Sequence, residues 1–159
     1  MTEAQQSMPT GIVVGVDGSP LSVEALKWAV RLAPSVGGQI TAVTAWQHPI
    51  AGGMGEFPGM QWNPRLDAEA VLEKALHEAF GASRPEGLEA VVANGSAAHV
   101  LVEKSKHAAL LVVGSRGLGG FRGLLLGSVS TVCAEHAGCP VLVLHEHSVA
   151  KAAAGRATA

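Results

Sequence analysis

The residues of this chain most suited to chemistry lie in a glycine-rich segment, residues 114–130. The segment holds six glycines and two arginines and directly follows the apolar run 108–113. Glycine lets the backbone reach positive φ and lets a ligand approach the main chain, while a helix beginning near Ser128 would point unpaired N–H groups at a bound anion. The segment therefore predicts a phosphate-binding loop, to which Arg116 and Arg122 could add positive charge.

The spacing of these glycines excludes two common kinds of phosphate loop. A Walker A loop needs Gly-Lys followed by Ser or Thr, and the chain contains no Gly-Lys dipeptide. A dinucleotide fingerprint needs Gly-x-Gly-x-x-Gly directly after the first strand, whereas the first apolar run here ends in a single glycine before Asp17. The pattern that remains is Gly-x2-Gly-x9-Gly-Ser, formed by Gly114, Gly117, Gly127 and Ser128.

Length and composition limit the class of protein. With 159 residues, of which 48% are hydrophobic and 15% charged, the chain can bury one sizeable core, so we expect a single domain. The formal net charge of −2 does not favour a nucleic-acid partner. Because no apolar run approaches the roughly 20 residues of a membrane span and residues 1–6 lack the features of a signal peptide, we expect no membrane association and a cytoplasmic location.

Strand and helix patterns alternate along the chain. Continuous apolar runs indicate strands, and apolar residues at helical spacing behind Ser, Asn or Pro indicate helices. The expected strands are 11–16, 40–46, 88–93, 108–113 and 141–144, and the expected helices are 19–36, 63–80, 96–106 and 129–136. Pro34 indicates a kink or a loosening near the end of the first helix.

This alternation predicts an α/β fold. A single domain, residues 11–146, would contain an open five-stranded parallel sheet with helices on both faces and right-handed crossovers. Residues 1–10 are expected to be flexible, 48–63 to form a long loop, and 147–159 to be a disordered tail. Ligands of such sheets collect at the carboxyl ends of the strands, so Asp17, Ala45 and the glycine-rich segment are expected to surround one ligand.

Three separated segments together resemble the universal stress protein family, in its nucleotide-binding branch. They are Val-Val-Gly-Val-Asp-Gly-Ser at 13–19, the glycine series described above, and Cys-Pro-Val-Leu-Val-Leu at 139–144. The resemblance runs from about residue 11 to 145. It implies a Rossmann-like fold related to the adenine nucleotide α hydrolases, and a cytoplasmic stress-response sensor or regulator that binds ATP, with Mg or Mn carried by the phosphates.

The resemblance also implies roles for the matching positions. Contacts to the adenosine portion would come from Gly15, Val16 and Asp17, and the adenine edge would meet the backbone of Ala45. The ribose and phosphates would be wrapped by Val113, Gly114, Ser115, Arg116, Gly117, Leu118, Gly119 and Gly120. The phosphate tail would be held by Gly127, Ser128, Val129 and Ser130.

Several of these residues have structural interpretations as well. Asp17 can serve as a turn or N-cap residue, and Ser128 and Ser130 can cap a helix. Arg116 and Arg122 can equally be solubilising surface residues.

No catalytic or metal-ligating group is recognisable. The chain has no Gly-x-Ser-x-Gly elbow and no His-Glu-x-x-His motif, so we expect at most slow ATP hydrolysis. Cys133 and Cys139 are expected to be ordinary buried thiols, and the pair His145 and His147 to be solvated.

Two alternatives to ATP binding stay open. One is a nucleotide-free dimerisation module of the same fold, and the other is a protein that binds cyclic AMP or AMP. In each case a homodimer is expected through the apolar fifth strand, residues 141–144, if that strand lies at the sheet edge.

Overall fold

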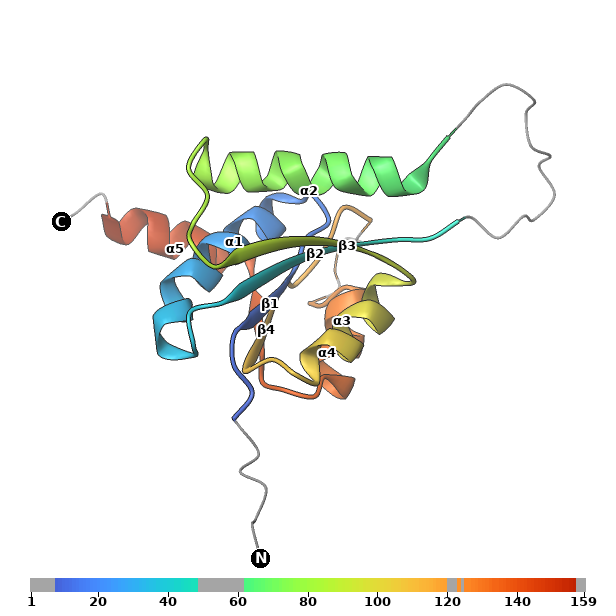
Figure 1. Ribbon diagram of the computed structural model, residues 1–159. Coiled ribbons are helices and arrows are strands. Elements are labelled where there is room, and N and C mark those ends of the chain that lie inside the picture. The colour runs from blue at the N-terminus through green and yellow to red at the C-terminus, as the bar shows by residue number, and fades with distance from the viewer. Residues whose placement is uncertain (1–7, 49–61, 120–122, 124, 157–159) are drawn as a thin grey trace, which may run out of the picture.

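The computed structural model describes residues 8–48, 62–119, 123 and 125–156 (Figure 1). The strands are β1 (Ile12–Gly15), β2 (Ile40–Trp46), β3 (Leu88–Asn94), β4 (Leu110–Gly114) and β5 (Val141–Leu144). The helices are α1 (Pro20–Leu32), α2 (Pro64–Phe80), α3 (Ala97–Ser105), α4 (Ser128–His136) and α5 (Glu146–Arg156), and a 3-10 turn, η1 (Ala33–Ser35), follows α1. None of the described helices is long and apolar enough to span a bilayer.

All five strands are parallel and lie in the order β3-β2-β1-β4-β5. The predicted single-domain α/β fold is therefore confirmed. The chain builds outward from β1 through β2 to β3, then crosses to the other side of β1 to add β4 and β5. The strand order consequently reverses between β1 and β4, where open parallel sheets hold their ligands.

The reversal also separates the helices into two layers, with α1 and α2 over one face of the sheet and α3 and α4 over the other (Figure 1). Successive residues of β1 alternate between the two cores, because side chains of a strand point to opposite faces. Ile12 and Val14 pack in the core under α1 and α2, whereas Val13 packs with Leu101 and Cys133 under α3 and α4.

The first helix is shorter than predicted. Ser19 caps α1 and Pro20 is its first residue, but regular α-helix ends at Leu32 rather than at 36. Pro34 lacks a backbone N–H and its ring would clash with the preceding turn, so the chain continues as the 3-10 turn Ala33–Ser35. The predicted loosening at Pro34 is therefore confirmed.

The C-terminal segment differs from the expected disordered tail. Residues 146–156 form α5, a helix whose alanines, glutamate, lysine and arginine have high intrinsic helix propensity. The alanine-rich composition, which is the basis for expecting a disordered tail, instead favours a helix here. The expected flexible residues 1–7, most of the expected loop 48–63 and residues 157–159 lie outside the described residues, and residues 8–10 have no regular secondary structure.

Candidate functional site

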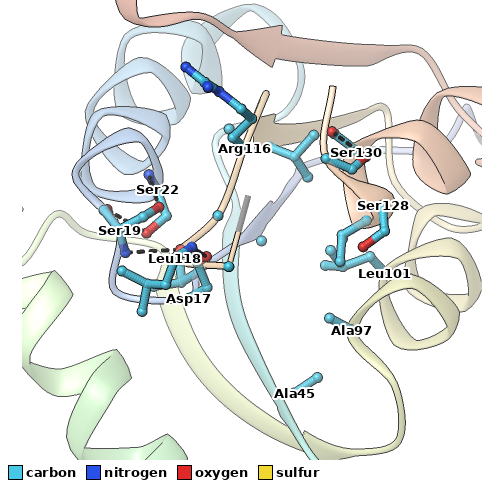
Figure 2. Close-up of a pocket in the computed structure, with 18 of the residues that line it drawn as sticks. Asp17, Ser19, Ser22, Ala45, Ala97, Leu101, Arg116, Leu118, Ser128 and Ser130 are labelled. Atoms are coloured by element: carbon cyan, nitrogen blue, oxygen red, sulfur yellow. Dashed lines mark hydrogen bonds between the residues drawn. The ribbon is translucent and has the colours of Figure 1, made fainter. Parts of the chain in front are cut away.

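A cleft of about 760 Å³ opens at the carboxyl ends of the central strands (Figure 2). Its volume is in the range typical of small-molecule sites. The predicted residues that line it are Gly15, Val16, Asp17, Ala45, Val113, Gly114, Arg116, Gly117, Leu118, Gly119, Gly127, Ser128, Val129 and Ser130. Figure 2 shows Asp17, Ser19 and Leu118 on one wall and Ala97, Leu101 and Ser128 on the opposite wall.

Asp17 joins two loops that line the cleft. Its Oδ1 accepts a hydrogen bond from the Ser19 N–H at 2.9 Å, which is the expected turn interaction. Its Oδ2 accepts another from the Leu118 N–H at 3.0 Å, in the loop after β4. Gly117 lies close against this carboxylate, and a Cβ at this position would force the carboxylate or the loop to move. The carboxylate thus positions the glycine-rich loop as well as facing the cleft.

Close packing against α3 explains the glycine at the end of β1. A Cβ on Gly15 would lie 2.8 Å from Leu101 Cδ1, so a larger residue here would require Leu101 to shift from this strand end. The next residue, Val16, donates its N–H to the Val43 carbonyl, and its own carbonyl accepts a hydrogen bond from the buried Thr44 hydroxyl. These bonds hold the backbone rigid where it enters the cleft.

Ser115 lies behind the cleft wall rather than along it. It is buried, and its N–H donates to the Leu144 carbonyl at 2.8 Å. Its carbonyl accepts hydrogen bonds from the Gly127 N–H at 2.6 Å and from Ser130 Oγ at 2.7 Å. Ser115 therefore ties β5, the glycine-rich loop and the start of α4 together.

The first turn of α4 faces the cleft without a side-chain cap. Its N-cap is Gly127, so Ser128 is the first helical residue, and its side chain does not cap the helix. Ser130 Oγ donates to the Ser115 and Gly127 carbonyls instead of accepting from a helix N–H. The capping interpretation of both serines is therefore wrong. Residues 127–132 line the cleft, so the start of α4, with the unpaired N–H groups and partial positive charge of a helix end, lies at its wall.

Arg116 lines the cleft, but its guanidinium is directed elsewhere. Figure 2 shows this side chain extending away from Ser128 and Ser130. Its Nη2 lies 3.6 Å from Glu146 Oε1, at the start of α5. Two further predicted residues, Gly120 and Arg122, lie outside the described residues.

Sequence reasoning missed part of the cleft lining. These residues are Ser19, Ser22, Val43, Ala97, Leu101, Leu126, Thr131 and Val132. The position of Ala97 could have been predicted from the helix that follows β3. Ser96 was predicted to cap a helix directly after β3, and that helix start lies at the same edge of the sheet as the ends of β1 and β4.

Ionisable groups are scarce around the cleft. Among the lining residues, Asp17 and Arg116 are the charged side chains. Within the described part of the chain, no group of three or more His, Cys, Asp or Glu side chains is placed to hold a metal ion. Cys133 and Cys139 are free thiols, and burial raises the pKa of Cys133 to about 11. A thiol with so high a pKa is unreactive at neutral pH.

Comparison with known proteins supports a family assignment. The sequence profile of the universal stress protein family matches residues 8–145. A universal stress protein of Mycobacterium tuberculosis (strain H37Rv) is 38% identical over 137 residues, covering 85% of this chain and 45% of the relative. One from Mycolicibacterium smegmatis is 32% identical over 148 residues, covering 89% and 50%. The chain thus spans about half the length of the curated relatives it matches.

Solved structures show the same fold. A universal stress protein in complex with cAMP superposes with a TM-score of 0.61 at 30% identity, covering 86% of this chain and 96% of that one. The universal stress protein from Archaeoglobus fulgidus in complex with dAMP has a TM-score of 0.60 at 19% identity, covering 86% and 98%. At that identity the second likeness concerns the fold alone.

Proposed function

Because the chain belongs to the universal stress protein family, we propose that its cleft binds an adenine nucleotide and that ATP is the principal ligand. The solved relative at 30% identity holds cAMP, which supports an adenine nucleotide as the class of ligand. The cleft volume of about 760 Å³ is large enough for a ligand of this class.

The first turn of α4 carries the proposal. Helices α1 and α3 also begin near the cleft, but the side chains of Ser19 and Ser96 accept hydrogen bonds from their first turns. Helix α4 begins at Gly127 without such a cap. Backbone N–H groups at an uncapped helix start are a favourable site for a phosphate, which would take the place of the missing cap.

The remaining groups divide between the two ends of the nucleotide. The apolar end of the cleft, with Val43, Ala45 and Ala97, suits a base, and the glycines of the loop suit the ribose and phosphates. Divalent cations such as Mg or Mn are bound by several oxygen ligands, and Asp17 is the one carboxylate among the lining residues that the structure describes. We therefore propose that the cation is carried by the nucleotide's phosphates rather than bound in a site formed by the protein. We expect hydrolysis to be slow at most, because the described lining holds no second carboxylate and no histidine, lysine or cysteine to act beside Asp17.

Isothermal titration of the purified protein with ATP and Mg tests the proposal. We expect saturable binding below millimolar concentration. Gly127→Val should weaken it strongly, because the added side chain crowds the start of α4, where a Cβ would lie 3.5 Å from the Ser115 carbonyl oxygen and 3.6 Å from Arg116 Cα. The φ of −75° at Gly127 is one that any residue can adopt, so no backbone strain is added. Gly155→Val, in open space on α5, is the control that should bind like the wild type. Absence of binding at millimolar ATP would refute the proposal.

Cyclic AMP or AMP is a second candidate ligand, because the 30% identical relative was solved with cAMP. Direct competition among ATP, AMP and cyclic AMP at one protein concentration separates the candidates. We expect ATP to bind most tightly, since the loop and the α4 turn offer donors for several phosphates. A tenfold preference for cyclic AMP would instead assign the cleft to that ligand.

We further propose that the protein acts as a cytoplasmic homodimeric stress-response regulator. Strand β5 lies at one edge of the sheet, and Val141, Leu142 and Val143 are only half-buried there. An edge strand with apolar side chains favours pairing with a second copy. Light scattering at micromolar concentration should give the mass of two chains, and the mass of one chain would contradict the dimer. Dimerisation without any nucleotide binding would favour the nucleotide-free alternative.

A further inference from the structure

The ion pair between Arg116 and Glu146 bears on the ligand preference of the cleft. Arg116 follows β4 in the glycine-rich loop, and Glu146 is the first residue of α5. Their closest nitrogen and oxygen atoms are 3.6 Å apart. The family profile ends at residue 145, so this partner of Arg116 lies just beyond the matched residues.

The backbone of Arg116 lies beside the proposed phosphate site. A Cβ built on Gly127 would be 3.6 Å from Arg116 Cα, so the arginine side chain starts next to the first turn of α4. Its long, flexible stem could carry the guanidinium to an anion bound there. In the structure the guanidinium instead extends away from Ser128 and Ser130 (Figure 2), and its Nη2 lies near Glu146 Oε1.

We propose that Glu146 is a specificity-determining residue that withholds the Arg116 charge from the cleft and so limits affinity for highly charged nucleotides. This inference rests on the proposed nucleotide-binding function. When Glu146 is neutral, Arg116 is released and contributes its charge to the phosphates. The effect grows with the number of phosphates and is absent for adenosine.

The size of the effect follows from the exposure of the pair. The side chain of Arg116 is 32% exposed and that of Glu146 is 71% exposed. Ion pairs this open to water are weak, so breaking this one costs the fold little, and releasing Arg116 should tighten ATP binding about two- to fivefold. Helix α5 should persist without the pair, because Arg116 bonds to its carboxylate and not to its backbone.

A double-mutant cycle with isothermal titration tests this role, using the full chain, ATP and adenosine. E146Q should bind ATP about two- to fivefold more tightly than the wild type, with adenosine affinity unchanged. In the R116Q background the same E146Q change should have no effect on ATP affinity. E135Q, an equally exposed glutamate near the end of α4, is the matched control and should bind like the wild type.

Each other outcome has a distinct meaning. ATP binding of equal affinity in wild type and E146Q would overturn the role of Glu146 and leave the proposed function intact. Tightening that persists in the R116Q background would also overturn it, because the effect would then come from net charge alone. Absence of ATP binding in every variant would overturn the proposed function, and the role of Glu146 with it.

Discussion

The Asp17 carboxylate accepts a hydrogen bond from the Leu118 N–H at 3.0 Å, and so joins two loops whose residues lie 101 positions apart in the chain. One loop follows β1 and the other follows β4, on either side of the point where the strand order reverses. The same carboxylate also accepts the Ser19 N–H. A single side chain therefore holds the turn before α1 and the glycine-rich loop in one arrangement.

Replacing Asp17 by alanine should release the glycine-rich loop. We expect the Leu118 amide to exchange with solvent faster, because it loses its acceptor, and ATP affinity to fall about tenfold for the loss of one charge-assisted hydrogen bond and its ordering of the loop. Amide exchange measured by NMR and isothermal titration give the two readouts. Asp67→Ala removes the other aspartate, on α2, and should leave both values unchanged. An unaltered Leu118 exchange rate in Asp17→Ala would contradict this role.

Gly117→Ala should have a similar effect for a steric reason. The new Cβ would collide with the Asp17 carboxylate, so the loop must shift and the bond to Leu118 is strained or lost. ATP affinity should therefore fall, whereas Gly155→Ala, on α5 where a Cβ meets nothing within 4 Å, should bind normally. In the Asp17→Ala background the collision is relieved, so Gly117→Ala should add little. Fully additive losses in titration would argue against the collision.

Ser130→Ala should lower stability where Ser128→Ala does not. Ser130 is buried and its hydroxyl donates to the Ser115 carbonyl at 2.7 Å, whereas Ser128 is exposed. Loss of the buried hydrogen bond should reduce the free energy of unfolding by about 1 kcal/mol. Urea denaturation of the two variants and the wild type measures the difference, and equal stabilities of the two variants would refute the structural role of Ser130.

Alkaline pH should destabilise the fold through Cys133. Burial raises its folded-state pKa from 9.0 to about 11, so between these values the unfolded chain loses the thiol proton while the folded chain keeps it. The stabilising contribution is complete below pH 9 and is lost as the pH rises toward 11. Unfolding free energies measured across this range should fall less steeply for Cys133→Ala. A slope identical to the wild type would show that other groups cause the loss.

The strands and helices of this fold could be predicted because their signals are local. Strand β2 follows from one apolar run, and helix α2 from apolar residues at helical spacing behind the N-cap Asn63, with Pro64 as its first residue. The sequence was misleading at the ends of the chain's elements. Helix α1 ends at Leu32 rather than at 36, and residues 146–156 form a helix where a disordered tail was predicted.

Residue types and their spacing along the chain were enough to predict where the cleft lies, at the strand ends, with glycines and a helix start along it. They could not indicate which groups meet across the reversal of strand order. That Asp17 holds Leu118, that Ser115 lies behind the wall, and that Arg116 turns to Glu146 all depend on the pairing of β4 with β1 and of β5 with β4, and on where α5 then begins. Such contacts join residues remote in the chain, and only the folded geometry brings their atoms within bonding distance.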